Sequence, residues 1–193
     1  MTTGKTVIFA IAMCIASLGI GCAPPYAVIE QATVAPLEGA TSFAVLDVDT
    51  TALARDRRSD REVLAGKGYV DGPREISRSF AAHLRLQAAR EGVAEIHRDP
   101  EAAHFVIRPR LERMEPGHVD LVTRLPSRVS LLVSIEDRRG YVFETIRVQS
   151  STDVELGRVL ARETHDRDLR ELARGVAVYL ADRTRQSPHP ASW

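Results

Sequence analysis

Apolar residues recur with helical spacing in two stretches of the chain. Over 72–92, which opens with Gly72-Pro73 and ends in Gly92, they fall on every fourth position and predict one buried stripe, namely Ile76, Phe80, Leu84 and Ala88. A second helix is expected over 166–183, with Thr164 or Asp166 as its cap. Its apolar face should hold Leu169, Leu172, Val176, Tyr179 and Leu180.

Strand patterns fill the remaining apolar segments. The run 42–48 suits a buried strand, and shorter strands are expected at 93–96 and 105–111. Pro109 has no backbone donor, so its strand should lie at an exposed sheet edge or be bulged there. Alternation over 129–136, a turn ending in Gly140 and a return over 141–149 predict a hairpin.

This order of elements predicts an α+β fold. A strand, a helix and a strand come first, which implies one β-α-β crossover, and a hairpin and a final helix follow. We expect a mostly antiparallel sheet of about four strands with two helices packed on one face, preceded by a signal helix.

The N-terminus has the pattern of an export signal. Residues 7–20 are nearly continuously apolar, a length typical of a signal and shorter than the roughly 20 residues of a membrane-spanning helix. The segment Gly19-Ile20-Gly21-Cys22 resembles the end of a bacterial lipoprotein signal, in which the cysteine is acylated and becomes the new N-terminus. Gly19 departs from that pattern, since an aliphatic residue is usual there. An ordinary cleaved signal and an uncleaved anchor remain the alternatives.

The positions of the cysteines and the local composition predict four segments along the chain. Cys14 lies within the signal, so the mature chain would keep Cys22 alone, which favours acylation over a disulfide. We expect a signal peptide at 1–21, a proline-containing tether at 22–41, a domain at 42–185 and a flexible tail at 186–193. Within the domain, the charged loop 50–72, with a helical turn around Leu53 or Leu64, is either a partner-contact surface or a solvated insertion.

Charge and residue types exclude several classes of function. The chain of 193 residues balances 26 Lys+Arg against 26 Asp+Glu, which excludes a basic nucleic-acid-binding module. Aromatic residues make up only 5%, too few for a surface on which bases or sugars stack. The histidines lack metal-ligand spacing, so neither a metal nor another cofactor is expected.

One motif carries candidate chemistry. The segment Asp47-Val48-Asp49-Thr50-Thr51 resembles the first motif of haloacid-dehalogenase-type phosphatases, which follows a hydrophobic strand. The resemblance implies Asp47 as nucleophile and Asp49 as general acid/base, with magnesium. The later motifs are missing, because Lys67 comes too early and no alternating β/α order follows residue 100. A lipoprotein phosphatase therefore stands as the alternative to a strand-end turn.

The chain as a whole resembles small envelope lipoproteins of Gram-negative bacteria with a compact α+β domain. That group includes the lipopolysaccharide-assembly lipoprotein, auxiliary lipoproteins of ABC-type lipid transport and many families without assigned function. The likeness is carried by Gly21-Cys22, 43–47, 91–93, 99–107, the hairpin 129–149 and the final helix. It implies a non-enzymatic role in binding, assembly or transport support, with an envelope protein as partner. Ala23, in place of an aspartate after the cysteine, favours the outer membrane, with the domain facing the periplasm.

Overall fold

A computed structural model describes most of the expected domain. The described residues are 24–31, 37–56, 72–93, 95–115, 118–119, 124–153 and 161–185. The predicted signal, Cys22, Leu64 and the tail 186–193 lie outside them. The elements in chain order are β1 (Tyr26–Gln31), β2 (Ser42–Val45), α1 (Thr51–Asp56), α3 (Gly72–Glu91), β3 (Glu95–His97), the 3₁₀ turn η2 (Pro100–Ala102), β4 (Phe105–Glu115), β5 (His118–Val119), β6 (Arg124–Leu125), β7 (Ser127–Asp137), β8 (Val142–Thr152) and α4 (Ala161–Thr184).

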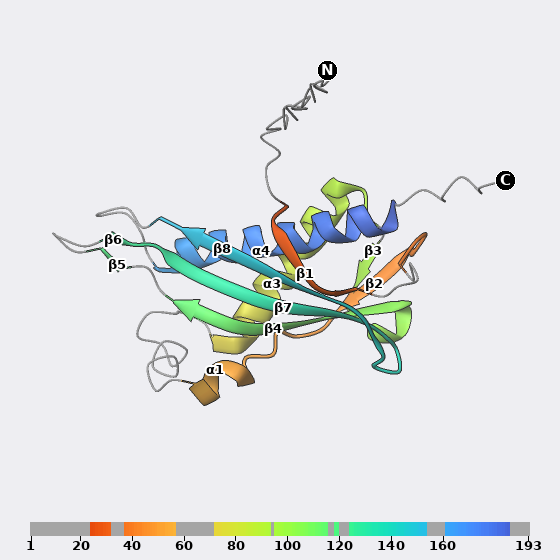
Figure 1. The fold of residues 1–193 in the computed structure, drawn as a ribbon, viewed down its shortest axis with the longest axis horizontal. Helices are drawn as coiled ribbons and strands as arrows, with labels where there is room; N and C mark the ends of the chain where they lie inside the picture. The colour runs from red at the N-terminus through yellow and green to blue at the C-terminus, as the bar shows by residue number, and fades with distance from the viewer. Residues whose placement is uncertain are drawn as a thin grey trace, which may run out of the picture.

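The described strands form a six-stranded mixed sheet in the order β1-β8-β7-β4-β2-β3 (Figure 1). The strands β3, β2 and β4 are parallel neighbours, and β4, β7, β8 and β1 pair antiparallel. The crossover from β2 through α3 to β3 confirms the predicted β-α-β unit. The strands β5 and β6 form a separate two-stranded sheet.

The helices α3 and α4 pack against each other on the same face of the sheet (Figure 1). The predicted stripe of α3 and the predicted apolar face of α4 are buried, and both meet the core-facing residues of β4, β7 and β8. The turn glycines Gly92 and Gly140 have φ angles of 69° and 83°, a region that disfavours other residues. These local predictions are confirmed.

Several expectations about the sheet and about the start of the last helix are wrong. The sheet has six strands, where about four were expected, with β1 at one edge beside β8 and the short β3 at the other edge beside β2. This strand, residues 26–31, comes from the stretch assigned to the tether, and Leu37 of the same stretch is fully buried. The helix α4 begins at Ala161, so Thr164 and Asp166 lie within the helix and do not cap it.

Pro109 lies in an interior strand, so the expected exposed edge there is also wrong. The backbone of Leu46 donates to Ile107 at 3.0 Å, and that of Asp49 donates to Pro109 at 2.9 Å. Leu111 in turn donates to Asp49 at 2.8 Å. Between Leu46 and Asp49 the chain leaves the ladder, and the proline nitrogen faces this gap. The missing donor therefore removes no regular ladder bond.

Candidate functional site

The two aspartates of the phosphatase-like motif have different surroundings. Asp47 is exposed just after β2. The Asp49 carboxylate accepts a hydrogen bond from the backbone nitrogen of Thr51 at 2.8 Å, at the start of α1. This is an Asx turn, in which a short acidic side chain accepts a hydrogen bond from the backbone two residues ahead. The motif thus forms a strand-to-helix turn. Of the loop 50–72, the described part confirms the helical turn at Leu53.

The sheet face opposite α3 and α4 carries a set of charged and polar side chains, here called the open face: Arg108, Arg110, Glu112, Arg128, Ser130, Glu136 and Arg147. They alternate with core-facing residues along β4, β7 and β8, since successive side chains of a strand point to opposite faces. Alternating arginines in 105–115 were a sequence signal for this face.

Ion pairs order the open face. The Arg108 Nε atom lies 2.9 and 3.1 Å from the two carboxylate oxygens of Glu136. Arg147 contacts both oxygens of Glu112, at 2.8 Å from Nε and 3.2 Å from Nη2. The Arg147 hydrogen bonds hold the pKa of Glu112 below its usual value, against the effect of burial. Planar guanidinium groups held in this way present a fixed pattern of donors and charge.

A second polar cluster joins α4 to the strands. The Asp168 carboxylate is fully buried and accepts hydrogen bonds from Ser127 at 2.6 Å, Ser150 at 2.7 Å and Thr152 at 2.7 Å. Three hydroxyl donors compensate for the burial of this carboxylate. Burial lowers the pKa of the nearby His165 to about 4, although the Asp168 charge acts in the opposite direction.

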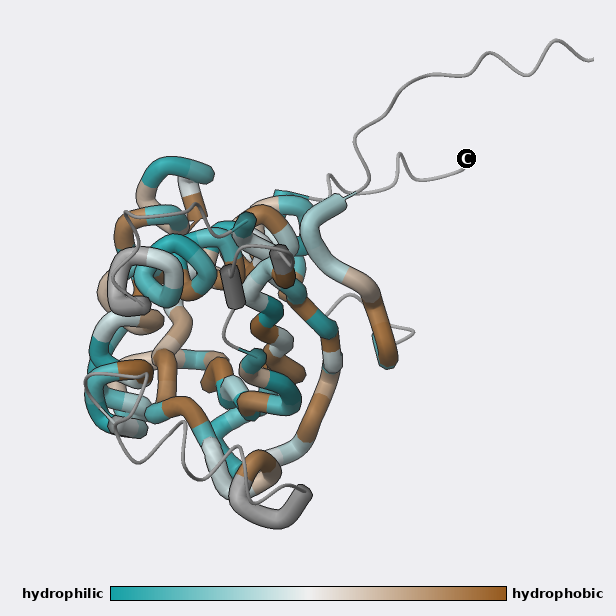
Figure 2. Tube along the Cα trace, turned by 90° about the vertical axis from the view of Figure 1, so that its left-hand side faces the viewer, coloured by the Kyte–Doolittle hydropathy of each residue, from teal (hydrophilic) through white to brown (hydrophobic). Residues whose placement is uncertain are grey.

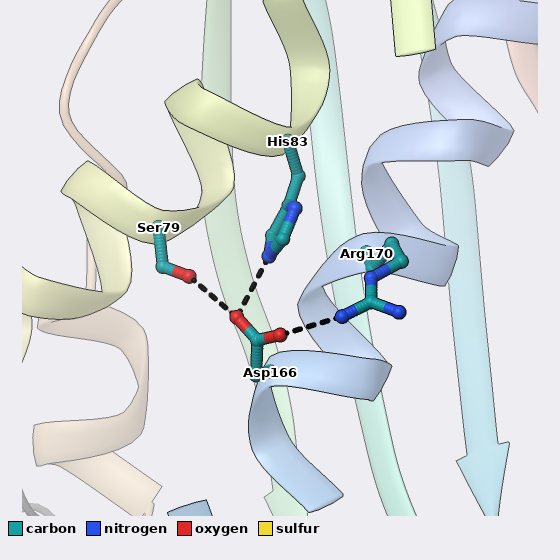
Figure 3. A network of polar contacts seen from close by, with 4 residues as sticks. All are labelled: Ser79, His83, Asp166 and Arg170. Atoms are coloured by element: carbon teal, nitrogen blue, oxygen red, sulfur yellow. Dashed lines mark hydrogen bonds and ion pairs between the residues drawn. The ribbon is translucent and has the colours of Figure 1, made fainter. Parts of the chain in front are cut away.

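Ser79, His83, Asp166 and Arg170 form a network between α3 and α4 (Figure 3). Ser79 Oγ and His83 Nε2 contact the same carboxylate oxygen of Asp166, at 3.2 and 2.7 Å, and Arg170 contacts the other at 2.8 Å. Burial raises the pKa of Asp166, but these hydrogen bonds outweigh it and lower the pKa overall. The serine donates to the carboxylate instead of to the imidazole, so the network cross-links the helices and lacks the geometry of an activated serine.

A buried ion pair fixes β1 and β8 to α4. Glu144 and Arg183 are bonded through both guanidinium Nε and Nη2, and the Tyr179 hydroxyl donates to Glu144 at 2.5 Å. The Tyr26 ring packs edge-on against Tyr179, with centroids 4.9 Å apart, and its hydroxyl donates to Asp182 at 2.8 Å. Burial, with the Asp182 contact, raises the pKa of Tyr26 to about 12.

The described ranges contain neither a cluster of metal ligands nor a membrane-spanning helix. There, no three His, Cys, Asp or Glu side chains come together as a metal site. Among the helices that the structure describes, none combines the length and apolarity needed to cross a bilayer. Cys22 lies outside these ranges, so its acylation stays a prediction.

Comparison with known proteins gives weak structural similarities. No family model and no curated protein matches the chain. A PelC dodecamer from Paraburkholderia phytofirmans is 12% identical over 83% of this chain and 98% of its own, with a TM-score of 0.47. The hypothetical protein CT253 from Chlamydia trachomatis is 16% identical over 73% and 98%, with a TM-score of 0.47. A minor lipoprotein from Acinetobacter baumannii is 11% identical over 74% and 93%, with a TM-score of 0.43.

Lipoproteins of Gram-negative bacteria thus occur among the structures similar to this chain, as the Acinetobacter baumannii protein illustrates. With TM-scores below 0.5 and identities of 16% or less, these similarities carry no argument about the site, the partner or the assembly of this chain.

Proposed function

We propose that this chain is an exported lipoprotein, acylated at Cys22 and held at the outer membrane facing the periplasm. Its α+β domain acts by binding another envelope component, in assembly or transport support, and not by catalysis. The anchor is inferred from the sequence, where an apolar signal ends in Gly21-Cys22.

The open face is the observation that carries the binding role. One side of the sheet is occupied by α3 and α4, while Arg108, Arg110 and Arg128 of the other side are exposed. The paired carboxylates hold two arginines of this face in place, so less side-chain entropy is lost when a partner binds. Arginines held on an ordered sheet suit a partner protein that supplies carboxylates.

A charge reversal on the open face tests this proposal. Arg110→Glu combined with Arg128→Glu should abolish recovery of a specific envelope partner from cross-linked, detergent-solubilised membranes, because repulsion replaces attraction. The matched control is Arg74→Glu combined with Arg90→Glu, on exposed positions of α3, which makes the same change in net charge. Equal recovery with both double variants would refute the open face as the binding surface.

The anchor is tested separately. Metabolic palmitate labelling should mark the wild-type chain and not Cys22→Ser, and only the wild type should sediment with membranes. An unlabelled wild-type chain that is as soluble as Cys22→Ser would refute acylation while leaving the open face to be tested by itself.

A further inference from the structure

Exposed apolar side chains gather along one edge of the sheet. In β1, Val28 is 43% and Ile29 51% exposed, and at the start of β8 Tyr141 is 66% and Val142 40% exposed. These are four of the six exposed large apolar side chains in the described part of the chain; Leu86 and Leu125 lie elsewhere. Figure 2 shows the apolar part of β1 at the outer margin of the fold.

Strand register makes these residues one continuous edge. Val28 pairs with Ile146, and Gln31, at the end of β1, pairs with Glu144. Among the described residues, β8 itself therefore continues the edge beyond Gln31, towards Val142 and the hairpin tip. At about 3.3 Å per residue, the four steps from Ile146 to Val142 span about 13 Å.

Hydrogen bonds close the turn at the hairpin tip. The Asp137 carboxylate accepts hydrogen bonds from the backbone of Arg139 at 2.8 Å and of Tyr141 at 2.9 Å, which closes the turn. The Tyr141 ring packs edge-on against Phe143, with centroids 5.1 Å apart. Arg138 and Arg139 are both exposed beside it, and Arg138 Nε donates a hydrogen bond to the Ala103 carbonyl at 2.6 Å. The tip therefore presents an aromatic ring and two arginines beside the Asp137 carboxylate, whose charge is not removed by the hydrogen bonds of the turn.

Only a short length of chain connects the expected acylation site to this edge. Cys22 precedes Tyr26 by four residues, a distance of at most about 14 Å for an extended chain. Tyr26 is itself held to α4 through Asp182 and Tyr179. A short connection to a fixed strand leaves the folded domain little freedom to move away from a bilayer that holds the acyl chains.

We propose that this edge, comprising Val28, Ile29, Arg138, Arg139, Tyr141 and Val142 and here called the membrane edge, lies against an anionic lipid surface. The tyrosine ring and the aliphatic side chains enter the interfacial layer, where aromatic residues are favoured. The two arginines face the lipid phosphates. Their two positive charges are matched in number by the carboxylates of Glu30 on β1 and Asp137 in the turn, so the attraction to phosphates is local to the arginine side chains at the tip. The open face then stays available to a protein partner. This inference rests on the proposed acylation of Cys22.

A site-specific fluorophore tests the orientation on the acylated protein. Val142→Cys and the control Leu86→Cys, which is 49% exposed on α3, are each labelled with an environment-sensitive dye, since an acylated Cys22 does not react. The proteins are reconstituted in vesicles of phosphatidylcholine and phosphatidylglycerol. Emission from the dye at position 142 should shift to the blue and be quenched by spin-labelled lipid. The dye at position 86 should keep the emission that it has in water and should not be quenched. Water-like emission from both positions, with acylation verified by mass, would overturn the proposal.

A second measurement separates the edge from the anchor. The mature chain with Cys22→Ser should bind these vesicles weakly, and Arg139→Ser should lower its partition coefficient about fivefold, as expected for one arginine near an anionic surface. Tyr141→Ser should also lower it, whereas Leu86→Ser should not. Circular dichroism verifies that each variant is folded. Equal partitioning of all variants would refute the membrane edge even if Cys22 is acylated.

Discussion

Replacing Glu144 by glutamine removes a buried charge and leaves its cationic partner in place. The side chains of Glu144 and Arg183 are 0% and 6% exposed, so water cannot solvate the guanidinium when the carboxylate is lost. Gln31 of β1 can still accept hydrogen bonds from Arg183 at 2.9 and 3.2 Å, with its amide oriented so that the oxygen faces the guanidinium. The amide, however, supplies no compensating charge.

The expected loss follows from burial. Removing one partner of a buried ion pair costs about 3–5 kcal/mol, and glutamine preserves side-chain volume, so we expect about 3 kcal/mol for Glu144→Gln. The matched control is Glu112→Gln, the same change in a pair with Arg147 whose side chains are 25% and 38% exposed. Pairs with this much solvent contact contribute about 0–1 kcal/mol.

Urea unfolding followed by circular dichroism measures both variants. With a slope of about 2 kcal/mol per molar urea, Glu144→Gln should lower the midpoint by about 1.5 M and Glu112→Gln by less than about 0.5 M. Replacing both partners, as Glu144→Leu with Arg183→Met, should recover much of the stability because no buried charge remains. Equal midpoint shifts for the two glutamine variants would refute the view that burial sets the strength of this contact.

Three further predictions follow from the same contacts. In Gly175→Ala the new Cβ would lie 2.8 Å from the Pro25 carbonyl oxygen and 3.0 Å from Val148. Overpacking should cost about 1–3 kcal/mol and outweigh the roughly 1 kcal/mol gained in helix propensity, so the variant should be less stable. A higher urea midpoint than that of the wild type would contradict this prediction. The pKa of His165 is lowered to about 4, so on acidification the unfolded chain binds the proton before the folded chain does. The free energy of unfolding should therefore fall by about 2 kcal/mol between pH 7 and 5. His165→Gln should remove this dependence of stability on pH, and a wild-type stability that does not change over this range would contradict the prediction. Asp47→Asn should leave phosphate release in a magnesium-containing phosphatase assay at the wild-type background, whereas turnover that depends on Asp47 would favour the phosphatase alternative.

Local patterns predicted the elements whose information lies within one segment. The stripe of α3 and the alternation of β7 are periodic over many residues, and Gly92 and Gly140 mark ends that need positive φ. The hairpin partner β8 follows directly along the chain, so its pairing required no long-range information. The Asp-x-Asp motif could not be interpreted in this way, because a strand-end turn and a catalytic pair have the same short sequence.

The remaining features depended on contacts between distant segments. The strand β1 has a short apolar pattern between prolines, and it becomes part of the sheet because Tyr26 pairs with Val148 and contacts α4. The first turns of α4 lack an apolar stripe, and the buried Asp168 of this helix accepts hydrogen bonds from hydroxyls of β7 and β8, which are distant in sequence. The open face and the membrane edge arise in the same way: residues far apart in sequence acquire a common surface only once the strands are in register. Sequence periodicity reports which side of an element is apolar, but the partner that covers that side, or leaves it open, is selected by packing.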